Sequence, residues 1–468
     1  MEPTTMRAIA IAAVLMLGHP AADVYDGWRL AIQNWSFNRF TVFEAMEKAS
    51  ALGLDWMEAY PGQILSSQTG NVVFDHNLSD QLRQQVKERL ASFGIRLVNY
   101  GVVSMPQQEE QCRQIFSFAK QMGIETIIAE PPQSSLDMLE RLCRQYQIRL
   151  AIHNHPRPSP YWDPNTVLAA CNGRSSWIGA CADTGHWVRS GLDPLDCLRR
   201  LRGRVICVHM KEIDATTQPM VDVIWGKGQG RVGAQLRELH EQGFRGVISI
   251  EYEADWQDNI AQIAGCIGFY NRLAAGLRPS GWRPLFSEDL SDATMAKPGG
   301  WQMIGQVLEK KAGGDIWTKA TYGNFILDLQ FKTEKGTNSG VFLRAQRPEW
   351  LPWPEVQIQD EQPGQPMDRH SCGGIYDIIA PSANAVRPTG QWNRMTIVAD
   401  GPFITVVLNG QQVVDMDLNL WTEPKRNPDG STNKFDVAYK DLPRVGMIGL
   451  QDHQTPITFR NLRIRPLP

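Results

Sequence analysis

The chain has 468 residues, of which 42% are hydrophobic and 21% charged, and its 47 basic side chains nearly balance its 50 acidic ones, for a formal charge of −3. This length predicts two or three domains, each large enough to bury a core. The even charge excludes a protein that binds nucleic acid without sequence preference, which needs a basic surface, and the apolar content excludes a disordered chain.

The chain begins with a short apolar run. Arg7 precedes ten apolar residues, 8–17, and small residues follow them. Ten residues are too few to cross the ~30 Å of membrane hydrocarbon but suit the core of a secretory signal. We therefore predict a signal peptide over 1–22, no membrane span, and a periplasmic or secreted protein. The alternative is a cytoplasmic protein in which this segment packs on the fold.

Eight cysteines are spread through apolar runs that resemble strands and helices. None of them shows the close spacing of a zinc site or a redox motif. We expect mostly buried free thiols that pack as small apolar groups. They are Cys112, Cys143, Cys171, Cys181, Cys197, Cys207, Cys266 and Cys372.

Between residues 23 and 277, short apolar runs alternate with longer amphipathic segments such as 41–53 and 78–94, in which apolar residues recur every three to four positions. Eight strand–helix units over ~250 residues predict a (β/α)8 TIM barrel. A doubly wound sheet is disfavoured because no glycine-rich turn follows the first strand. The expected strands are 28–35, 55–60, 95–100, 125–130, 148–153, 177–183, 204–210 and 246–252.

From about residue 280 the pattern changes to short segments in which apolar and polar residues alternate, separated by Gly, Pro and Asn. Asn409-Gly410 between two β-rich runs is a strong hairpin signal. This texture predicts a second domain over 280–468, an antiparallel jelly-roll β-sandwich. The expected strands are 323–333, 339–346, 353–360, 373–380, 392–400, 403–416, 446–453 and 457–466.

Four residues at the ends of the expected barrel strands are able to ligate a metal: Glu130, Asp183, His209 and Glu251. Side chains at these ends face the active site of a barrel. Three carboxylates and one imidazole would repel one another without a cation, so the set predicts a divalent metal. Oxygen-rich ligation with one imidazole favours Mn²⁺, with Mg²⁺, Co²⁺ and Zn²⁺ as alternatives. Because this set is complete without Glu58, we assign Glu58 a structural role.

His153 and His155 follow the fifth expected strand. Either histidine is a candidate general acid next to the metal. The alternative is that one of them orients a ligand carboxylate. Strand alternation slightly favours His153 as the catalytic member.

The barrel resembles the xylose-isomerase-like family of sugar isomerases and epimerases, in Glu130, in Asp183-Thr184-Gly185-His186, in His209-Met210-Lys211-Glu212 and in Glu251. The resemblance implies that the four matching positions hold a divalent metal and that the two glutamates move protons. It also implies that His186 contacts substrate oxygens and that Lys211 faces the substrate. The alternative for Lys211 is a surface salt bridge with Glu212.

The second domain resembles the 3-keto-disaccharide hydrolase domain family, a concanavalin-like sandwich. The matching segments are 281–286, 338–344, 355–358, 374–378, 390–393, 449–453 and 459–462. Glu355 and Gln357 are two apart on a strand and share a face, as do Gln451 and His453. Together with Arg344 they are predicted to line a polar concave substrate surface, the alternative being a solvent-facing sheet.

The two resemblances imply one chemistry. We expect a metal-dependent enzyme that cleaves small-molecule 3-keto-glycosides by removing the C2 proton and eliminating the C1 substituent, with Glu251 or Glu130 as base and His153 or His155 as acid. A second hypothesis is a metal-dependent sugar isomerase or epimerase whose sandwich binds carbohydrate. A third is a non-catalytic carbohydrate-binding protein.

Overall fold

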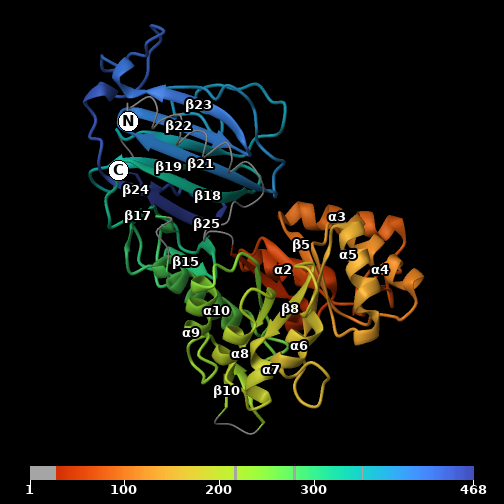
Figure 1. Ribbon diagram of the computed structural model, residues 1–468. Helices are drawn as coiled ribbons and strands as arrows, with labels where there is room; N and C mark the ends of the chain where they lie inside the picture. The colour runs from red at the N-terminus through yellow and green to blue at the C-terminus, as the bar shows by residue number, and fades with distance from the viewer. Residues whose placement is uncertain (1–27, 216–218, 278–280, 350–351, 468) are drawn as a thin grey trace. The chain divides into compact units, whose positions relative to one another are not determined.

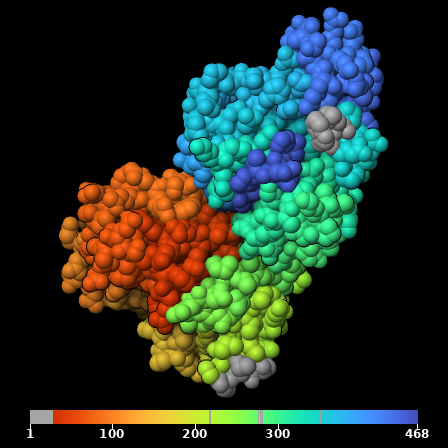
Figure 2. Space-filling view, turned by 180° about the vertical axis from the view of Figure 1, so that it is seen from behind, coloured from red at the N-terminus to blue at the C-terminus, as the bar shows by residue number. Residues whose placement is uncertain are grey.

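The computed structural model describes residues 28–215, 219–277, 281–349 and 352–467, and it divides into two compact units on either side of Leu277 and Arg278 (Figure 1). Figure 2 shows one face of each unit, the barrel in red to light green and the sandwich in green to blue. The predicted signal peptide lies outside the described residues. None of the helices in the described part is both long and apolar enough to cross a membrane.

The first unit is a closed barrel of eight parallel strands, which confirms the predicted fold class. Each expected apolar run overlaps one of these strands. Around the barrel the order is β1, β12, β9, β8, β7, β6, β5, β2. The strands are β1 (Arg29–Gln33), β2 (Trp56–Ala59), β5 (Arg96–Val103), β6 (Thr126–Ala129), β7 (Arg149–His153), β8 (Ile178–Asp183), β9 (Val205–Met210) and β12 (Val247–Ile250).

Helices follow the strands and cover the outside of the barrel. They are α2 (Val42–Ala51), α3 (Asp80–Phe93), α4 (Glu109–Met122), α5 (Leu136–Tyr146), α6 (Pro164–Cys171), α7 (Thr184–Arg189), α8 (Pro194–Arg200), α9 (Val232–Glu241) and α10 (Ile260–Leu277). Thr41 and Glu44 form a capping box at the start of α2. Gly94 ends α3 in the left-handed conformation, with φ of 68°. Figure 1 shows α3, α4 and α5 side by side.

Short elements extend the strand ends of the barrel. They are the 3-10 helices η1 (Asn34–Phe37) and η2 (Gln133–Ser135), the hairpin β3 (Gln63–Ile64) with β4 (Val73–Phe74), and the hairpin β10 (Glu212–Asp214) with β11 (Val221–Val223). η1 begins directly after β1, at the end of the barrel where the predicted site residues lie. All eight cysteines are buried and free, as predicted.

The second unit contains two antiparallel sheets, as expected for a sandwich. One sheet holds β13 (Arg283–Pro284), β15 (Trp301–Ile304), β16 (Val307–Lys310), β18 (Phe325–Thr333), β21 (Trp392–Asp400), β22 (Phe403–Leu408), β23 (Gln411–Asp417) and β25 (Ile457–Pro466). The other holds β14 (Ala293–Met295), β17 (Ile316–Thr318), β19 (Asn338–Ala345), β20 (Glu355–Gln359) and β24 (Met447–Leu450). Two short 3-10 helices, η3 (Leu418–Leu420) and η4 (Tyr439–Asp441), complete the unit. A single buried cluster takes apolar side chains from both sheets.

Two local predictions in the sandwich had opposite outcomes. The hairpin at Asn409-Gly410 is confirmed, since both residues have positive φ, 49° and 86°, between β22 and β23. The expected strand 373–380 is wrong: this segment forms turns with isolated bridges. Its extended path is broken because Gly373 and Asp377 have φ of 87° and 60°.

A buried ionic cluster joins strands of the larger sheet. Asp328 on β18 accepts hydrogen bonds from Arg394 Nε at 2.9 Å, Arg463 Nε at 2.8 Å and Thr396 Oγ1 at 2.8 Å. Burial opposes ionisation of Asp328, but the charges of Arg394 and Arg463 outweigh it and lower its pKa. The carboxylate therefore ties β18, β21 and β25 together.

Replacing Asp328 with asparagine is expected to lower the free energy of unfolding by about 3 kcal/mol, because the buried guanidinium of Arg463 and the partly buried one of Arg394 lose their counter-charge. Urea denaturation of the full chain measures this loss. Asp436→Asn, which removes one partner of the exposed pair Lys425–Asp436, serves as the control and should cost less than about 1 kcal/mol. Equal losses in the two variants would contradict a stabilising role for the cluster.

Candidate functional site

Buried ionisable side chains gather at the carboxyl ends of four neighbouring barrel strands. Asp183 ends β8 and lies directly opposite His209 of β9 in the strand register. His153 ends β7, and Glu251 follows β12. All four are at most 7% exposed. Asn154 holds the main chain of Asp183 through two hydrogen bonds of 2.9 Å.

One oxygen of Asp183 is the centre of this group. Asp183 Oδ2 lies 3.5 Å from His153 Nε2, 3.4 Å from His186 Nε2 and 3.9 Å from His209 Nδ1. Atoms that each lie about 2.1 Å from one metal ion are about 3.0–3.5 Å apart in octahedral or tetrahedral coordination. The spacing around Asp183 Oδ2 is therefore close to that of a shared metal ion. Three overlapping triads in the described residues bring potential ligand atoms together: His153–Asp183–His186, Asp183–His209–Glu251 and Glu130–His153–His155.

His209 has one nitrogen engaged and one available. Its Nε2 lies 2.6 Å from Glu58 Oε1, whereas its buried Nδ1 has no hydrogen-bond partner in the described part of the chain and lies 3.0 Å from Glu251 Oε2. A carboxylate on the outer nitrogen commonly orients a metal-binding imidazole. Because the nitrogen faces the Glu251 carboxylate, it fits a bound cation, or an ion pair with Glu251 when the ring is protonated.

Glu58, which was assigned a structural role from the sequence, contacts Nε2 of His209 and so helps to orient its ring. Its carboxylate also accepts hydrogen bonds from Gln33 at 2.6 Å, Asn99 at 3.1 Å and Ser249 at 2.8 Å. These partners come from β1, β5 and β12, so they were not recognisable as one group from the sequence. Their effect is to fix the Glu58 carboxylate and, through it, the ring of His209.

Lys211 supplies one positive charge inside the group. Its buried ammonium lies 2.6 Å from Asp183 Oδ2 and 2.7 Å from Glu251 Oε2. Burial opposes its charge, but the carboxylates of Asp183 and Glu251 outweigh it and raise its pKa. The surface pair with Glu212 is not formed, since Glu212 instead accepts hydrogen bonds from the main-chain nitrogens of Gly226 and of Val232, the first residue of α9.

Glu130 contacts this group through His153 and also binds His155. Its Oε1 is 3.1 Å from His153 Nδ1 and accepts a 2.9 Å hydrogen bond from the main chain of His155, while Ser159 Oγ donates to its other oxygen at 2.5 Å. The hydrogen bond that the Glu130 carboxylate accepts from the ring of His155 raises the pKa of His155, whose side chain is 48% exposed. Three of the four predicted ligands, Asp183, His209 and Glu251, thus come together, whereas Glu130 groups with His153 and His155.

The charges of the cluster do not balance on the protein's own groups. Four carboxylates, Glu58, Glu130, Asp183 and Glu251, face the Lys211 ammonium and three buried imidazoles. One of these imidazoles, His209, adds a second positive charge, because the effect of burial is outweighed by Glu58 and Glu251, which raise its pKa well above its usual range. A divalent cation would offset the excess negative charge. Imidazole nitrogens mixed with carboxylate oxygens favour Mn²⁺, Co²⁺ or Zn²⁺ over Mg²⁺. His153, Asp183, His186, His209 and Glu251 are the residues that would hold it.

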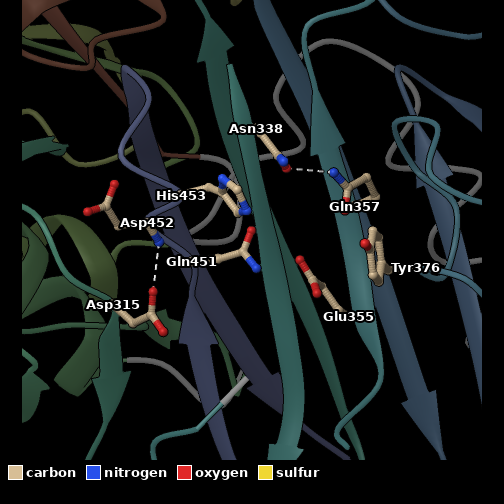
Figure 3. Close-up of a pocket in the computed structure, with 8 residues that line it drawn as sticks. All are labelled: Asp315, Asn338, Glu355, Gln357, Tyr376, Gln451, Asp452 and His453. Carbon is tan, nitrogen blue, oxygen red and sulfur yellow. Dashed lines mark hydrogen bonds between the residues drawn. The ribbon is translucent and has the colours of Figure 1, made fainter. Parts of the chain in front are cut away.

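The sandwich has a separate polar pocket of about 290 Å³ on its smaller sheet (Figure 3). Three of its side chains follow β24, two come from β20 and the others from β19 and adjacent turns. They are Asp315, Asn338, Glu355, Gln357, Tyr376, Gln451, Asp452 and His453. Glu355, Gln357, Gln451 and His453 had been predicted as substrate contacts.

Glu355 is the most perturbed group of this pocket. Burial raises its pKa to about 8, and the charge of Lys434 only partly offsets that effect. Among the described residues, no donor pairs with its carboxylate. A Cβ at Gly340 would lie 2.2 Å from Glu355 Oε1, so the glycine in β19 leaves room for the carboxylate over the sheet. Glu355 is thus available to exchange a proton near neutral pH.

Two amide oxygens beside Glu355 are also unsatisfied. Gln357 Oε1 and Gln451 Oε1 are buried without a hydrogen-bond partner in the described residues. In Figure 3 the side chains of Glu355 and Gln451 point into the same space. Such acceptors suit ligand hydroxyl groups. Arg344 is not part of this pocket, because its guanidinium donates to the main-chain oxygens of Gly323 and Gly401.

Comparison with known proteins gives one family match for each unit. Residues 46–268 match the family described as xylose isomerase-like TIM barrel. Residues 280–465 match the family described as 3-keto-alpha-glucoside-1,2-lyase-like domain. Both resemblances expected from the sequence are confirmed.

A curated 3-keto-disaccharide hydrolase of Bacteroides thetaiotaomicron is 29% identical over 182 residues, which cover 33% of this chain and 62% of that protein. The chain thus spans about 62% of the length of this relative. Two crystal structures from Parabacteroides distasonis are also similar. One, named as a proposed glycosyl hydrolase, is 39% identical over 40% of this chain and 99% of its own, with a TM-score of 0.37. The other, an uncharacterised protein, is 34% identical over 53% of this chain and 99% of its own, with a TM-score of 0.45.

Calorimetric titration of the full chain with Mn²⁺ is expected to show one site. Asp183→Asn should abolish binding, and Glu58→Gln should weaken it about 10- to 100-fold because the ring of His209 loses its support. Glu140→Gln, at a carboxylate on α5 that pairs with Arg144, is the control. Unchanged Mn²⁺ binding in Asp183→Asn would rule out this metal site.

The raised pKa of Glu355 predicts a pH-dependent stability. The folded protein keeps a proton up to about pH 8 that the unfolded chain loses near 4.5, so this contribution is full below about 4.5 and is lost as the pH rises to about 8. Glu355→Gln should therefore be more stable than the wild type by about 2–4 kcal/mol at pH 8 and similar to it near pH 4.5.

Thermal melts of the full chain at several pH values measure this difference. The transition of the sandwich is the one that Asp328→Asn shifts. Glu334→Gln, at an exposed carboxylate in the turn after β18, is the matched control. A constant difference between wild type and Glu355→Gln across this pH range would contradict the raised pKa.

Proposed function

We propose a function on the premise that this chain belongs to two families, the xylose isomerase-like TIM barrels through residues 46–268 and the 3-keto-alpha-glucoside-1,2-lyase-like domains through residues 280–465. The chain is proposed to be a carbohydrate-active enzyme that cleaves 3-keto-glycosides. Cleavage proceeds by removal of the C2 proton and elimination of the C1 substituent, and water then adds to the product.

The observation that carries this proposal is the buried charge cluster around Asp183 Oδ2. Removing a proton next to a ketone places negative charge on the C3 oxygen, which a site with fixed positive charge stabilises. The barrel provides the buried ammonium of Lys211 and the set of metal-binding side chains. A bound divalent cation would act as a Lewis acid on the negative C3 oxygen.

The reaction balances as an elimination followed by a hydration. A base takes the proton from C2, and the electron pair moves toward the C3 carbonyl. The C1–O bond then breaks, the aglycone leaves as an alcohol after gaining a proton, and a C1–C2 double bond forms. Addition of water returns a hydroxyl to C1 and a proton to C2, so the net reaction is hydrolysis.

The contacts favour Glu251 over Glu130 as the base. Glu130 already accepts hydrogen bonds from three neighbouring residues, His153, His155 and Ser159. The carboxylate of Glu251 faces the cluster, with Lys211 and His209 as its neighbours. His155 is the better donor to the leaving oxygen, because its side chain is 48% exposed whereas that of His153 is 2% exposed.

The sandwich pocket is a second location for the same cleavage. The lyase-like family match falls on this unit, and Glu355 has a pKa of about 8, raised by burial, which suits proton transfer. The barrel is favoured because the side chains that line the sandwich pocket are acidic or neutral apart from His453. An enolate formed there would lack a buried cation. The pocket is proposed to bind the glycoside.

The barrel cluster also suits a second function, sugar isomerisation or epimerisation. This reaction uses the same proton removal without loss of the C1 substituent. The observation that favours it is the family match of the barrel to xylose isomerase-like proteins. The two functions differ in whether an aglycone is released.

The test incubates the full chain and Mn²⁺ with a 3-keto-glucoside that carries a chromogenic aglycone. Aglycone release is expected, and Glu251→Gln should lower its rate about 100-fold or more, in the range for loss of a general base. Glu355→Gln should affect KM more than kcat.

Other outcomes assign the chemistry differently. Release that persists in Glu251→Gln and disappears in Glu355→Gln would place cleavage in the sandwich. Inversion at C2 or C3 without release would establish the epimerase. Absence of any reaction would overturn the proposal.

A further inference from the structure

One tryptophan differs from the others in its exposure. The side chain of Trp35 is 42% exposed, and it is the only tryptophan among the large hydrophobic residues that are exposed in the described part of the chain. It lies in η1, immediately after β1, and therefore at the same end of the barrel as the charge cluster. A single exposed apolar residue is ordinary, whereas several aromatic side chains that gather at one place can mark a binding surface.

Two further aromatic side chains stand beside Trp35. Tyr60 follows β2, with its ring centroid 5.0 Å from that of Trp35 at 77°. Trp256, in the segment after β12, has its centroid 6.5 Å away at 81°. Strands β12, β1 and β2 are consecutive in the barrel. Both contacts are edge-to-face, and we call these three residues the aromatic platform.

The platform is joined to the charge cluster by hydrogen bonds. The main-chain nitrogen of Trp35 donates to Gln33 Oε1 at 3.1 Å, and Gln33 Nε2 donates to Glu58 Oε1 at 2.6 Å. That oxygen is the one 2.6 Å from His209 Nε2. The aromatic platform therefore rests on residues that also position the cluster.

The segment after β12 is fixed to η1 as well. The main-chain nitrogen of Tyr252 donates to Ser36 Oγ at 2.9 Å, and Asn259 Nδ2 donates to the main-chain oxygen of Ser36 at 2.7 Å. Trp256 lies between these two attachment points. Its position next to Trp35 is thus set by the fold rather than by a free loop.

An open depression of about 750 Å³ adjoins the platform. Trp256 lines it together with polar side chains, namely Arg39, Asp255, Gln257, Asp258 and Gln262. An apolar ring face bordered by hydrogen-bonding groups is the arrangement that suits a sugar or aromatic ring, whose face is apolar and whose edge is polar.

We propose that the aromatic platform is the aglycone subsite of the barrel. It stacks on a ring-shaped aglycone, a second sugar or an aromatic group, while the keto-sugar lies at the charge cluster. This inference rests on the proposed function and adds a substrate class to it. The barrel would select glycosides with a ring-shaped aglycone over those with a small alkyl group.

The test compares phenyl and methyl 3-keto-glucosides as substrates of the full chain. Trp35→Ala should lower kcat/KM for the phenyl glycoside about tenfold and for the methyl glycoside less than twofold, since only the phenyl ring reaches the platform. Trp35→Phe should restore most of the preference. Trp177→Ala, at the opposite end of the barrel just before β8, is the matched control. Circular dichroism checks that each variant folds.

A loss that is equal for both substrates, or no loss for either, would overturn the subsite while leaving the proposed function intact. If the wild type cleaves neither glycoside, the proposed function fails. Calorimetric binding of the same two compounds then tests whether the aromatic platform binds the aglycone. Tighter binding of the phenyl compound that Trp35→Ala abolishes supports it. Sedimentation that shows a dimer dissociated by Trp35→Ala would instead assign the platform to contact between two copies and overturn the inference.

Discussion

The candidate chemistry of this protein depends on one buried carboxylate oxygen, Asp183 Oδ2, and the groups that gather around it. Three imidazole nitrogens lie 3.4–3.9 Å away, and the ammonium of Lys211 lies 2.6 Å away. A buried carboxylate is unfavourable without compensating charge. The barrel satisfies this constraint by ending four adjacent strands in side chains that can share a cation, and the same positive charge suits a sugar whose C3 oxygen becomes negative.

Supporting residues determine what the central group can do. Glu58 fixes the ring of His209, and Glu130 fixes that of His153. In each case the carboxylate holds one ring nitrogen and leaves the other facing the cluster. Gln33 contacts Glu58 and also receives the main chain of Trp35, so the aromatic platform and the cluster are held by one hydrogen-bonded layer. We therefore propose that the same hydrogen-bonded residues position both the groups that select the substrate and the groups that transfer the proton.

The fold was predictable from local patterns, whereas the composition of the site was predictable only in part. Apolar runs at regular spacing identified every strand of the barrel, because parallel strands that are buried on both faces must be apolar. Strand-end positions identified Asp183, His209 and Glu251. The contact between Glu130 and His153 was not predictable, since both lie at strand ends and the sequence does not show the direction of their side chains.

Other misses have similar physical causes. Glu58 was predicted to be structural, but its four partners could not be named because they come from four other strands. The segment 373–380 has the composition of a strand, yet positive φ values at Gly373 and Asp377 turn the chain there. In the sandwich, strand alternation placed Glu355 and Gln357 on one face correctly, while the pocket residues from turns, such as Tyr376 and Asp315, follow no periodic pattern.

The central claim is that the group around Asp183 holds a divalent cation. The most direct measurement is the anomalous-scattering map of a crystal grown with Mn²⁺. The account predicts a single strong peak in the barrel, about 2.0–2.3 Å from Asp183 Oδ2 and from the ring nitrogens of His153 and His209. A map with no peak at this position, and Lys211 alone between Asp183 and Glu251, would contradict it.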